Sequence, residues 1–333
     1  MKVFVTGGTG FVGKPTVGRL IEGGHGVRCL LRQASRAGEL ERVGCETIYG
    51  DVTDKASLIE GMAGCEWVVN LANLYSFWEP DKVLYRKVNV EGTRNVMEAA
   101  LEASVSKVVH VSSYVVWGKP SRSPFDEETP FGPERFTEYA RSKYEGDDVV
   151  WELYRQRGLP VVMLYPGIVL GAGDPKASGR YIEDLIEGRI PGMIFEDSAF
   201  TYVHVNDVAE AISLALKKEG NVGEKYLIGN QIFTWGEYTR MVCETSGMSP
   251  PKRRVPGAAV MAMAWLLTKV ADLSGRPPRL GMSTDQMRNL RAGGAFDGGK
   301  AERELGLTYT PLGVAIEEEV ASHKGKSEYG RSS

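Results

Sequence analysis

The chain has few of the residues that hold metals or build disulfide frameworks. Its 333 residues include four cysteines and four histidines. The cysteines are scattered and form no CxxC pair (Cys29, Cys45, Cys65 and Cys243). Metal sites show paired Cys or His spacing in sequence, and disulfide frameworks belong mainly to small secreted chains. We therefore expect neither a metal site nor a disulfide framework.

The chain also lacks an excess of either charge. It carries 40 Lys and Arg against 43 Asp and Glu, a net charge of −3. A nucleic-acid-binding surface leaves a basic excess in the composition. We therefore expect a small-molecule substrate and no nucleic-acid partner.

Long apolar runs are missing as well. The unbroken run 258–267 is too short to span a bilayer, which needs about 20 residues. Two interpretations stay open: a helix over a substrate pocket, or a peripheral membrane contact, because Arg253, Arg254 and Lys269 flank the run. A strand is expected from residue 2, which leaves no room for a signal peptide, so we expect a cytoplasmic protein.

Glycine, by contrast, is abundant, and it shapes the first thirteen residues. An apolar strand at 2–6 runs into Gly7, Gly10 and Gly13, spaced three apart, before a helix. This order provides a tight turn and free N–H groups at a helix start, which together bind pyrophosphate. The spacing GxxGxxG differs from the common GxGxxG, and an ordinary strand–helix turn is the alternative.

The end of the second expected strand, 27–32, carries basic residues and no acid. An acid about 20 residues after the glycines suits NAD, whereas an arginine accommodates the 2′-phosphate of NADP. The sequence there is Arg32-Gln33-Ala34-Ser35-Arg36. We predict that Arg32, with Ser35 and Arg36, holds that phosphate, with NAD as second choice. The alternative is a solvated basic turn.

Strands and helices are expected to alternate over the first half of the chain. Further strands are predicted at 47–49, 66–71, 107–111 and 159–164, with helices such as 81–103 and one starting near 136 between them. This alternation predicts an α/β fold with a parallel sheet covered on both faces. After Gly171 the alternation fails, although a strand at 200–205, a helix through 217 and a strand at 225–228 follow.

A tyrosine and a lysine four residues apart form the chemical feature of the chain. Tyr139 and Lys143 share one face of an expected helix. A lysine ammonium beside a phenol lowers a pKa that is normally about 10, so that the tyrosine can exchange a proton near neutral pH. Ser113 follows the strand 107–111, at the sheet edge where ligands bind in such folds. It would orient a substrate oxygen.

With these features the chain resembles the extended short-chain dehydrogenase/reductase family, the NAD-dependent epimerase/dehydratase group. Within it, the chain is similar to dihydroflavonol-4-reductase-like and hopanoid-associated sugar-epimerase-like proteins. Two positions depart from the family pattern: Tyr165 stands where an arginine is common, and Asn73 replaces a small residue. The matching pieces are TGGTGFVG (6–13), GDVTD (50–54), NLAN (70–73), NVEGTRN (89–95), VVHVSSYVVWG (108–118), YARSK (139–143), YPGIVLGAGD (165–174), YVHVNDVAEAI (202–212) and FDGGKAERELG (296–306).

The resemblance implies a fold, an assembly and residue roles. The fold is a Rossmann-type doubly wound parallel sheet (1–165 and 201–229) with a smaller C-terminal substrate-binding cap (166–200 and 230–321) and a tail (322–333). A homodimer through 81–103 and 136–158 is expected. Tyr139 would be the acid/base, Lys143 would bind the nicotinamide ribose, and Ser113, or else Ser112, would be the catalytic hydroxyl, supported by Asn89. The further cofactor contacts would be Gly7, Thr9, Gly10, Phe11, Val12, Gly13, Asp51, Val52, Leu71, Ala72, Asn73, Ser112, Pro166, Gly167 and Ile168.

Substrate contacts are predicted around the same edge. Tyr75, Phe77 and Trp78 would form an apolar wall for an aromatic or polyprenoid substrate, or else pack locally, and Tyr114 belongs to the substrate side. Arg180 would hold a substrate anion or hydroxyl, with an exposed surface arginine as the alternative. His204, within a strand, is expected to be a structural hydrogen-bonding residue.

Taken together, these features predict reversible hydride transfer between NADP(H) and a carbonyl or secondary alcohol carbon. Two alternatives stay open. One is a nucleotide-sugar epimerase or dehydratase that retains NAD. The other is a non-catalytic nucleotide-sensing protein.

Overall fold

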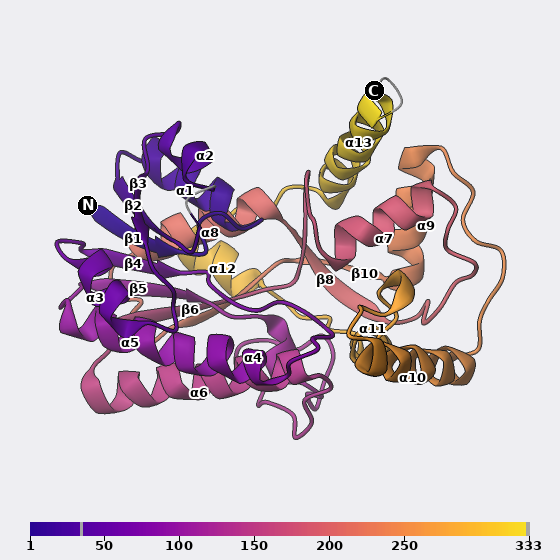
Figure 1. Ribbon diagram of the computed structural model, residues 1–333, viewed down its shortest axis with the longest axis horizontal. Helices are drawn as coiled ribbons and strands as arrows, with labels where there is room; N and C mark the ends of the chain where they lie inside the picture. The colour runs from indigo at the N-terminus through magenta and orange to yellow at the C-terminus, as the bar shows by residue number, and fades with distance from the viewer. Residues whose placement is uncertain (34–35, 331–333) are drawn as a thin grey trace.

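A parallel sheet of seven strands forms the larger part of the molecule (Figure 1). The computed structural model describes residues 1–33 and 36–330, with 324–330 as backbone alone. The strand order is β3-β2-β1-β4-β5-β6-β9, so the direction of winding reverses between β1 and β4. The predicted Rossmann-type sheet is confirmed. Its strands are β1 (Lys2–Thr6), β2 (Gly26–Leu31), β3 (Glu46–Tyr49), β4 (Trp67–Asn70), β5 (Lys107–Val111), β6 (Val161–Pro166) and β9 (Lys225–Ile228).

Alternate strand residues point into two cores, one on each face of the sheet. Phe4, Val68 and Val108 pack with α3 (Lys55–Met62), α5 (Thr93–Glu102) and α6 (Glu138–Arg157). Val3, Val69 and Val109 pack with α1 (Gly13–Glu22), α8 (Val205–Lys217) and α12 (Gly299–Leu305). Burial on both faces explains why these strands read as continuous apolar runs rather than alternating ones. The small helix α2 (Ala37–Glu41) joins β2 to β3.

The predicted helix 81–103 is not one regular α-helix. It consists of α4 (Val83–Arg86), a π-helical segment η2 (Lys87–Gly92) and then α5. α6 approaches this segment closely, because a Cβ on Gly146 would lie only 2.3 Å from the carbonyl oxygen of Asn89. A π-segment changes which way its side chains point, and such segments are frequent at functional sites.

A smaller sheet of three strands lies beside the large one. β8 (Ala199–His204) pairs parallel with β7 (Ile168–Leu170) and antiparallel with β10 (Gln231–Thr234). β8 thus lies outside the large sheet, whereas α8 and β9 after it return there; the predicted division into two domains stays a prediction. The surrounding helices are α7 (Ala177–Ile186), α9 (Trp235–Ser246), α10 (Gly257–Ser274), α11 (Thr284–Ala292) and α13 (Leu312–Gly330), the last of which continues into the predicted tail.

Local sequence signals set several helix ends. α6 begins after Thr137, whose hydroxyl accepts a hydrogen bond from the Ala140 N–H at 2.9 Å, and it ends at Gly158 with a φ of 68°. α8 is capped by the residue before it, His204, whose Nδ1 accepts a hydrogen bond from the Asn206 N–H at 3.1 Å. The other ring nitrogen of His204 lies 2.9 Å from Glu318 Oε2. The predicted structural role of His204 is therefore confirmed. All four cysteines are free and buried.

Candidate active site

The turn between β1 and α1 accepts no side chain at two of its glycines. Gly7 has a φ of 73°, and a Cβ there would lie 2.8 Å from the Leu71 carbonyl carbon. A Cβ on Gly13 would lie 2.1 Å from the Gly7 oxygen. The first turn of α1 has no acidic residue and no side-chain cap. The positive end of the helix dipole is therefore available to an anion such as a pyrophosphate.

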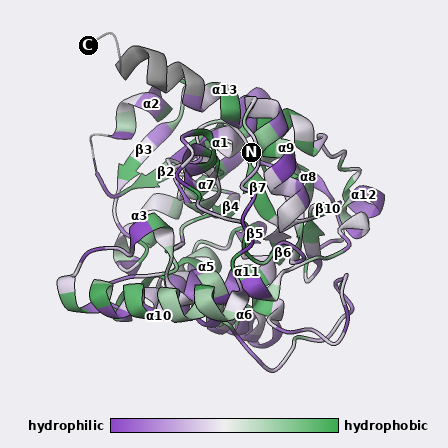
Figure 2. Ribbon diagram, turned by 90° about the vertical axis from the view of Figure 1, so that its right-hand side faces the viewer, coloured by the Kyte–Doolittle hydropathy of each residue, from purple (hydrophilic) through white to green (hydrophobic). Residues whose placement is uncertain are grey.

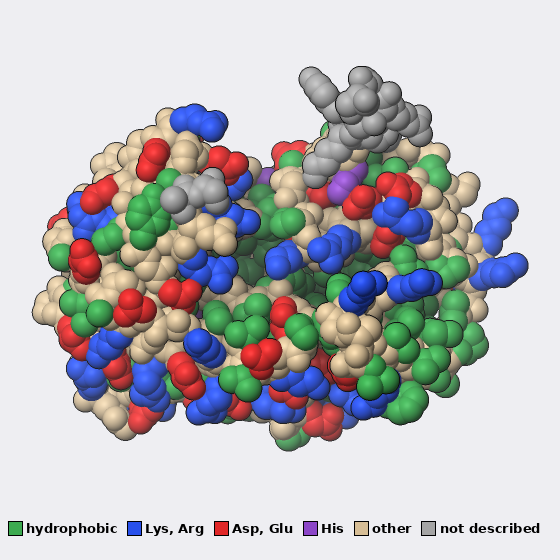
Figure 3. Space-filling view, viewed as in Figure 1, with side chains coloured by type: hydrophobic (Ala, Val, Ile, Leu, Met, Phe, Trp, Pro, Cys, Tyr) green, Lys and Arg blue, Asp and Glu red, His purple; other side chains and the backbone are tan. Residues whose placement is uncertain are grey.

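A cavity of about 940 Å³ runs from this turn along the carboxyl edge of the large sheet to α10 and α11. Figure 3 shows it as a hollow with hydrophobic side chains on its floor. The predicted residues that line it are Gly7, Thr9, Gly10, Phe11, Val12, Gly13, Arg32, Arg36, Asp51, Val52, Leu71, Ala72, Asn73, Tyr75, Phe77, Ser112, Ser113, Tyr114, Tyr139, Pro166, Gly167 and Ile168. Ser35 lies outside the described residues.

Two predicted substrate residues do not line the cavity. Trp78 turns away and donates its indole N–H to Asp272 Oδ1 at 2.9 Å. Arg180 is exposed to solvent. Within α7 the residues that line the cavity are Ala177, Ser178 and Tyr181, and Arg180 falls on another side of the helix. Trp78 thus lies outside the predicted substrate wall, and Arg180 matches the alternative interpretation, an exposed surface arginine.

Tyr139 lies buried among other aromatic rings. The centroid of the Tyr75 ring is 5.1 Å from that of Tyr139 with the planes at 78°, and Phe77 lies 6.1 Å away in a similar edge-to-face arrangement. Burial raises the pKa of Tyr139 above its ordinary value, while a hydrogen bond with the Ser113 side chain opposes the shift. The expected net lowering of this pKa is not what the structure shows. Desolvation disfavours the phenolate and is the larger effect.

Lys143 is buried and is not among the residues that line the cavity. Its Nζ donates to the Val111 carbonyl at 3.2 Å, and only 2% of the residue is exposed. Burial lowers the pKa of Lys143, and the charge of Asp147, one turn further along α6, opposes this shift. The lysine thus lies at the end of β5, close to the serines that follow.

A buried polar network separates the roles of the two serines. Ser112 donates to Asp147 Oδ2 at 2.8 Å. On the other side of Asp147, His110 Nε2 lies 3.7 Å from Oδ1, and His110 Nδ1 lies 2.9 Å from the Asn70 amide nitrogen. Because the Ser112 hydroxyl is held by Asp147, Ser113 is the hydroxyl that faces Tyr139.

Asn89 holds the aromatic loop against α6 and does not line the cavity. Its Oδ1 accepts from the Leu74 N–H at 2.7 Å, and its Nδ2 donates to Ser142 Oγ at 2.9 Å. Ser142 in turn donates to the carbonyl of Tyr139. Asn89 therefore fixes Leu74, just before Tyr75, relative to the helix turn that carries Tyr139.

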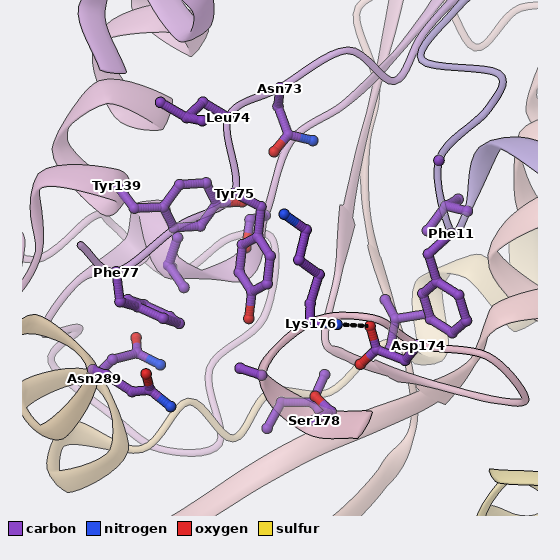
Figure 4. A pocket seen from close by; sticks show the side chains of 18 of the residues that line it. Phe11, Asn73, Leu74, Tyr75, Phe77, Tyr139, Asp174, Lys176, Ser178 and Asn289 are labelled. Carbon is purple, nitrogen blue, oxygen red and sulfur yellow. Dashed lines mark hydrogen bonds between the residues drawn. The ribbon is translucent and has the colours of Figure 1, made fainter. Parts of the chain in front are cut away.

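Several cavity residues were not predicted from the sequence. Figure 4 shows Lys176 extending beside Tyr75 toward Asn73, opposite Phe11. The turn that carries it is held by Asp174, which accepts from the backbone N–H of Lys176 at 2.8 Å and of Gly179 at 3.0 Å. A polar loop directly after a strand at this edge was the available signal. Asn289 had no such signal, because only tertiary packing brings it here.

A nucleotide cradle at the winding reversal of a parallel sheet, joined by one cavity to a Tyr–Lys–Ser cluster, defines the class of NAD(P)-dependent oxidoreductases. The sequence profile of the NAD dependent epimerase/dehydratase family matches residues 3–229. The chain belongs to this family, the extended short-chain dehydrogenases/reductases.

Full-length relatives agree with this assignment. Sterol demethylase protein B of Methylococcus capsulatus is 32% identical, covering 96% of this chain and 98% of its own length. A provisionally named dihydroflavonol 4-reductase of Synechocystis is 29% identical, over 95% of this chain and 93% of its own. The crystal structure of gox2253 is 32% identical, with a TM-score of 0.84 over 97% of this chain and 98% of that one. The chain is an enzyme of the oxidoreductase class.

Proposed function

We propose that this enzyme transfers hydride between NADP(H) and the carbonyl or secondary alcohol carbon of a largely apolar substrate. One observation carries the proposal. Arg32 and Arg36 line the nucleotide end of the cavity. At the other end, on the substrate side of Tyr139, Lys176 is the only cationic side chain among the described residues that line the cavity. The pyrophosphate of a nucleotide sugar would find little compensation there, because buried anions need paired charges. The apolar residues at this end are Tyr75, Phe77, Tyr114, Tyr181, Ile190, Ile194, Phe200, Trp235, Val255, Val260, Met263, Leu280, Met282, Met287 and Leu290.

The names of the relatives point in the same direction. One is called a sterol demethylase protein and the other a dihydroflavonol reductase. Both names refer to fused-ring substrates rather than to nucleotide sugars. We therefore infer a polycyclic or similarly extended apolar ketone or alcohol as the substrate class.

The residues at the sheet edge suit proton and oxyanion chemistry. Bound NADPH would supply hydride to the carbonyl carbon. Tyr139, kept protonated by its buried environment, donates its proton to the carbonyl oxygen, and Ser113 hydrogen-bonds that oxygen as its charge develops. After Tyr139 has given up its proton, the positive charge of Lys143 favours the resulting phenolate.

The cofactor preference rests on the basic end of β2. Arg32 and Arg36 are the charged residues of this turn that line the cavity, and both are exposed. Asp51, at the end of the next strand, has its carboxylate engaged by the backbone N–H and hydroxyl of Thr53, both at 2.8 Å. Two arginines without a ribose-binding acid favour the 2′-phosphate of NADP. A cytoplasmic homodimer stays a prediction.

The first experiment identifies the nucleotide by mass spectrometry after denaturing freshly purified protein, and titrates the stripped protein with NADPH and NADH. An empty or NADP-loaded protein that binds NADPH exchangeably supports the reductase. Retained NAD that does not exchange would support the epimerase instead.

Arg32→Asp tests the cofactor preference in the same titration. The variant is expected to weaken NADPH binding by about tenfold or more, the worth of one good charge-assisted contact, and to leave NADH binding nearly unchanged. The exposed Arg141 of α6, changed to Asp, is the matched control. Equal effects of Arg32→Asp on the two nucleotides would contradict the preference for NADP.

A further inference from the structure

An apolar stripe along α10 is exposed to solvent. Residues 259, 263, 266, 270 and 273 are spaced four and three apart, which places them on one side of the helix. Met263, Leu266, Val270 and Leu273 are 50%, 51%, 53% and 90% exposed, and Trp265 beside them is 58% exposed. We call the side chains of Met263, Trp265, Leu266, Val270 and Leu273 the α10 surface. Figure 2 shows α10 along the lower edge of the molecule with mostly hydrophobic colouring. Contiguous apolar patches of this kind mark interaction sites.

α10 is fixed to the protein by its opposite side. Val260, Ala264 and Ala271 are buried. Thr268 Oγ1 lies 3.0 Å from Thr284 Oγ1 on α11. Within the described part of the chain, α10 is the one helix long and apolar enough to cross a membrane. Because one side is packed against α11, the helix can lie in a membrane interface without leaving the fold.

Basic residues surround the α10 surface. The stretch 252–279 contains a single acid, Asp272, and its carboxylate accepts the hydrogen bond from Trp78. Arg254 pairs with Glu196 at 3.0 Å, yet its side chain stays 84% exposed. Figure 3 shows Lys and Arg side chains next to the green patch over this part of the molecule. The exposed cations of the stretch are Lys252, Arg253, Arg254, Lys269, Arg276 and Arg279.

The cavity opens at the same place. Met263 belongs both to the α10 surface and to the cavity wall, and Leu280, which is 47% exposed, lines the cavity as well. Ala259, one turn before Met263, is exposed and also lines it. The mouth of the cavity is therefore bordered by the apolar stripe.

We propose that the α10 surface docks on an anionic lipid bilayer, with the apolar side chains in the interface and the surrounding cations on the headgroups. Apolar area and positive charge act together in such binding. A second copy of the chain is a poorer partner, because a two-fold contact would bring the same basic rim against itself. Entry of an apolar substrate from the bilayer into the cavity rests on the proposed function, whereas docking does not.

The test is co-sedimentation of the full-length protein with vesicles of phosphatidylcholine alone or mixed with phosphatidylglycerol. The wild type is expected to bind the mixed vesicles, and salt is expected to weaken this binding. The double variant Leu266→Glu/Leu273→Glu is expected to lose about tenfold or more in binding, given the apolar area of two leucines. Arg276→Glu/Arg279→Glu is expected to lose the preference for phosphatidylglycerol. Val43→Glu, at a 49% exposed valine after α2 and far from α10, is the matched control and is expected to bind like the wild type.

Circular dichroism and NADPH titration of each variant confirm folding before vesicle binding is compared. Absence of wild-type binding, or equal binding by all variants, would overturn the proposal. So would a wild-type dimer that Leu266→Glu/Leu273→Glu converts to a monomer while no vesicle binds, because a second copy would then cover the α10 surface. Vesicle binding without any ketone reduction would refute the proposed function and leave the docking standing.

Discussion

The phenol of Tyr139 holds the proton that the proposed reduction requires. Changing Tyr139 to Phe removes the hydroxyl and keeps the ring that packs against Tyr75 and Phe77. We expect turnover to fall by about 10²- to 10⁴-fold, the usual contribution of a positioned general acid, with NADPH affinity nearly unchanged. Steady-state kinetics and a fluorescence titration measure the two effects.

The control for Tyr139→Phe is Tyr144→Phe on the same helix. The Tyr144 ring packs against Phe131 and the Arg135 guanidinium, away from the cavity. It is expected to keep nearly full activity. Full activity in Tyr139→Phe, or an equal loss in both variants, would contradict the role given to Tyr139.

Asp147 is expected to act on the reaction through Lys143. Burial lowers the pKa of Lys143 and the Asp147 charge opposes this, so Asp147→Asn should lower that pKa further. The ammonium would then be lost at a lower pH, and the alkaline limb of the kcat/KM profile would move toward lower pH. Asp148→Asn, at the exposed neighbouring residue, is the control. An unchanged profile with merely lower activity would assign Asp147 a structural role alone.

At single positions, the sequence predicted residues whose neighbours along the chain determine their place. Gly7, Gly13, Ser113 and Tyr139 follow from a turn, a strand end and a helix spacing. Trp78 was assigned to the wrong place, because its indole is directed by Asp272, almost two hundred residues away in sequence. The pKa of Tyr139 was predicted in the wrong direction for a related reason. Burial comes from the packed aromatic loop, whereas helix spacing shows only the lysine.

Among the elements, the turn from β1 into α1 allows the sharpest comparison. A Cβ on Gly13 would meet the Gly7 oxygen at 2.1 Å, whereas one on Gly18 of the same helix would meet nothing within 4 Å. Gly13→Ala must displace α1 from β1, so we expect a loss of about 2 kcal/mol in unfolding free energy and weaker NADPH binding. Gly18→Ala should stabilise the protein by up to about 1 kcal/mol, through helix propensity. Urea unfolding and NADPH titration compare them, and equal behaviour of the two variants would contradict the argument.

Element types were predictable where the period of the sequence is plain, and less so where packing changes the backbone. The π-helical segment η2 was expected as part of one helix, since nothing in 87–92 breaks helical periodicity. In the folded protein this segment lies against α6, where Gly146 comes close to the carbonyl oxygen of Asn89. The run 258–267 was expected either as a helix over the pocket or as a membrane contact, and the helix does contribute Ala259, Val260 and Met263 to the cavity. The helix continues beyond the run, through Thr268 to Ser274. Lys269 and Asp272 interrupt the apolar run without interrupting the helix.

For the whole molecule, the parallel sheet was predictable because each strand is followed by the helix that covers it. The smaller sheet was not predictable. β10 pairs with β8, although β9, which lies between them in sequence, belongs to the large sheet. The cavity likewise has one part that the sequence predicts and one that it does not. Its nucleotide end comes from consecutive strand ends, whereas its apolar end comes from α7, α9, α10 and α11. The sequence therefore indicates the cofactor class more directly than the substrate class.

The buried tyrosines predict how the stability of the whole molecule depends on pH. Burial raises the pKa of Tyr165, Tyr202 and Tyr238 well above 10 and that of Tyr114 to about 12. Above about pH 10 the unfolded chain releases these protons while the folded chain keeps them, so each such tyrosine lowers the unfolding free energy by about 1.4 kcal/mol per pH unit. Below pH 10 both states keep the protons and this contribution is constant. Exposed tyrosines such as Tyr49 release their protons without unfolding. The remaining phenolate absorbance should therefore appear only together with the loss of circular dichroism, and urea unfolding at rising pH should show a falling unfolding free energy. Phenolate absorbance that rises fully while the fold persists would contradict this prediction.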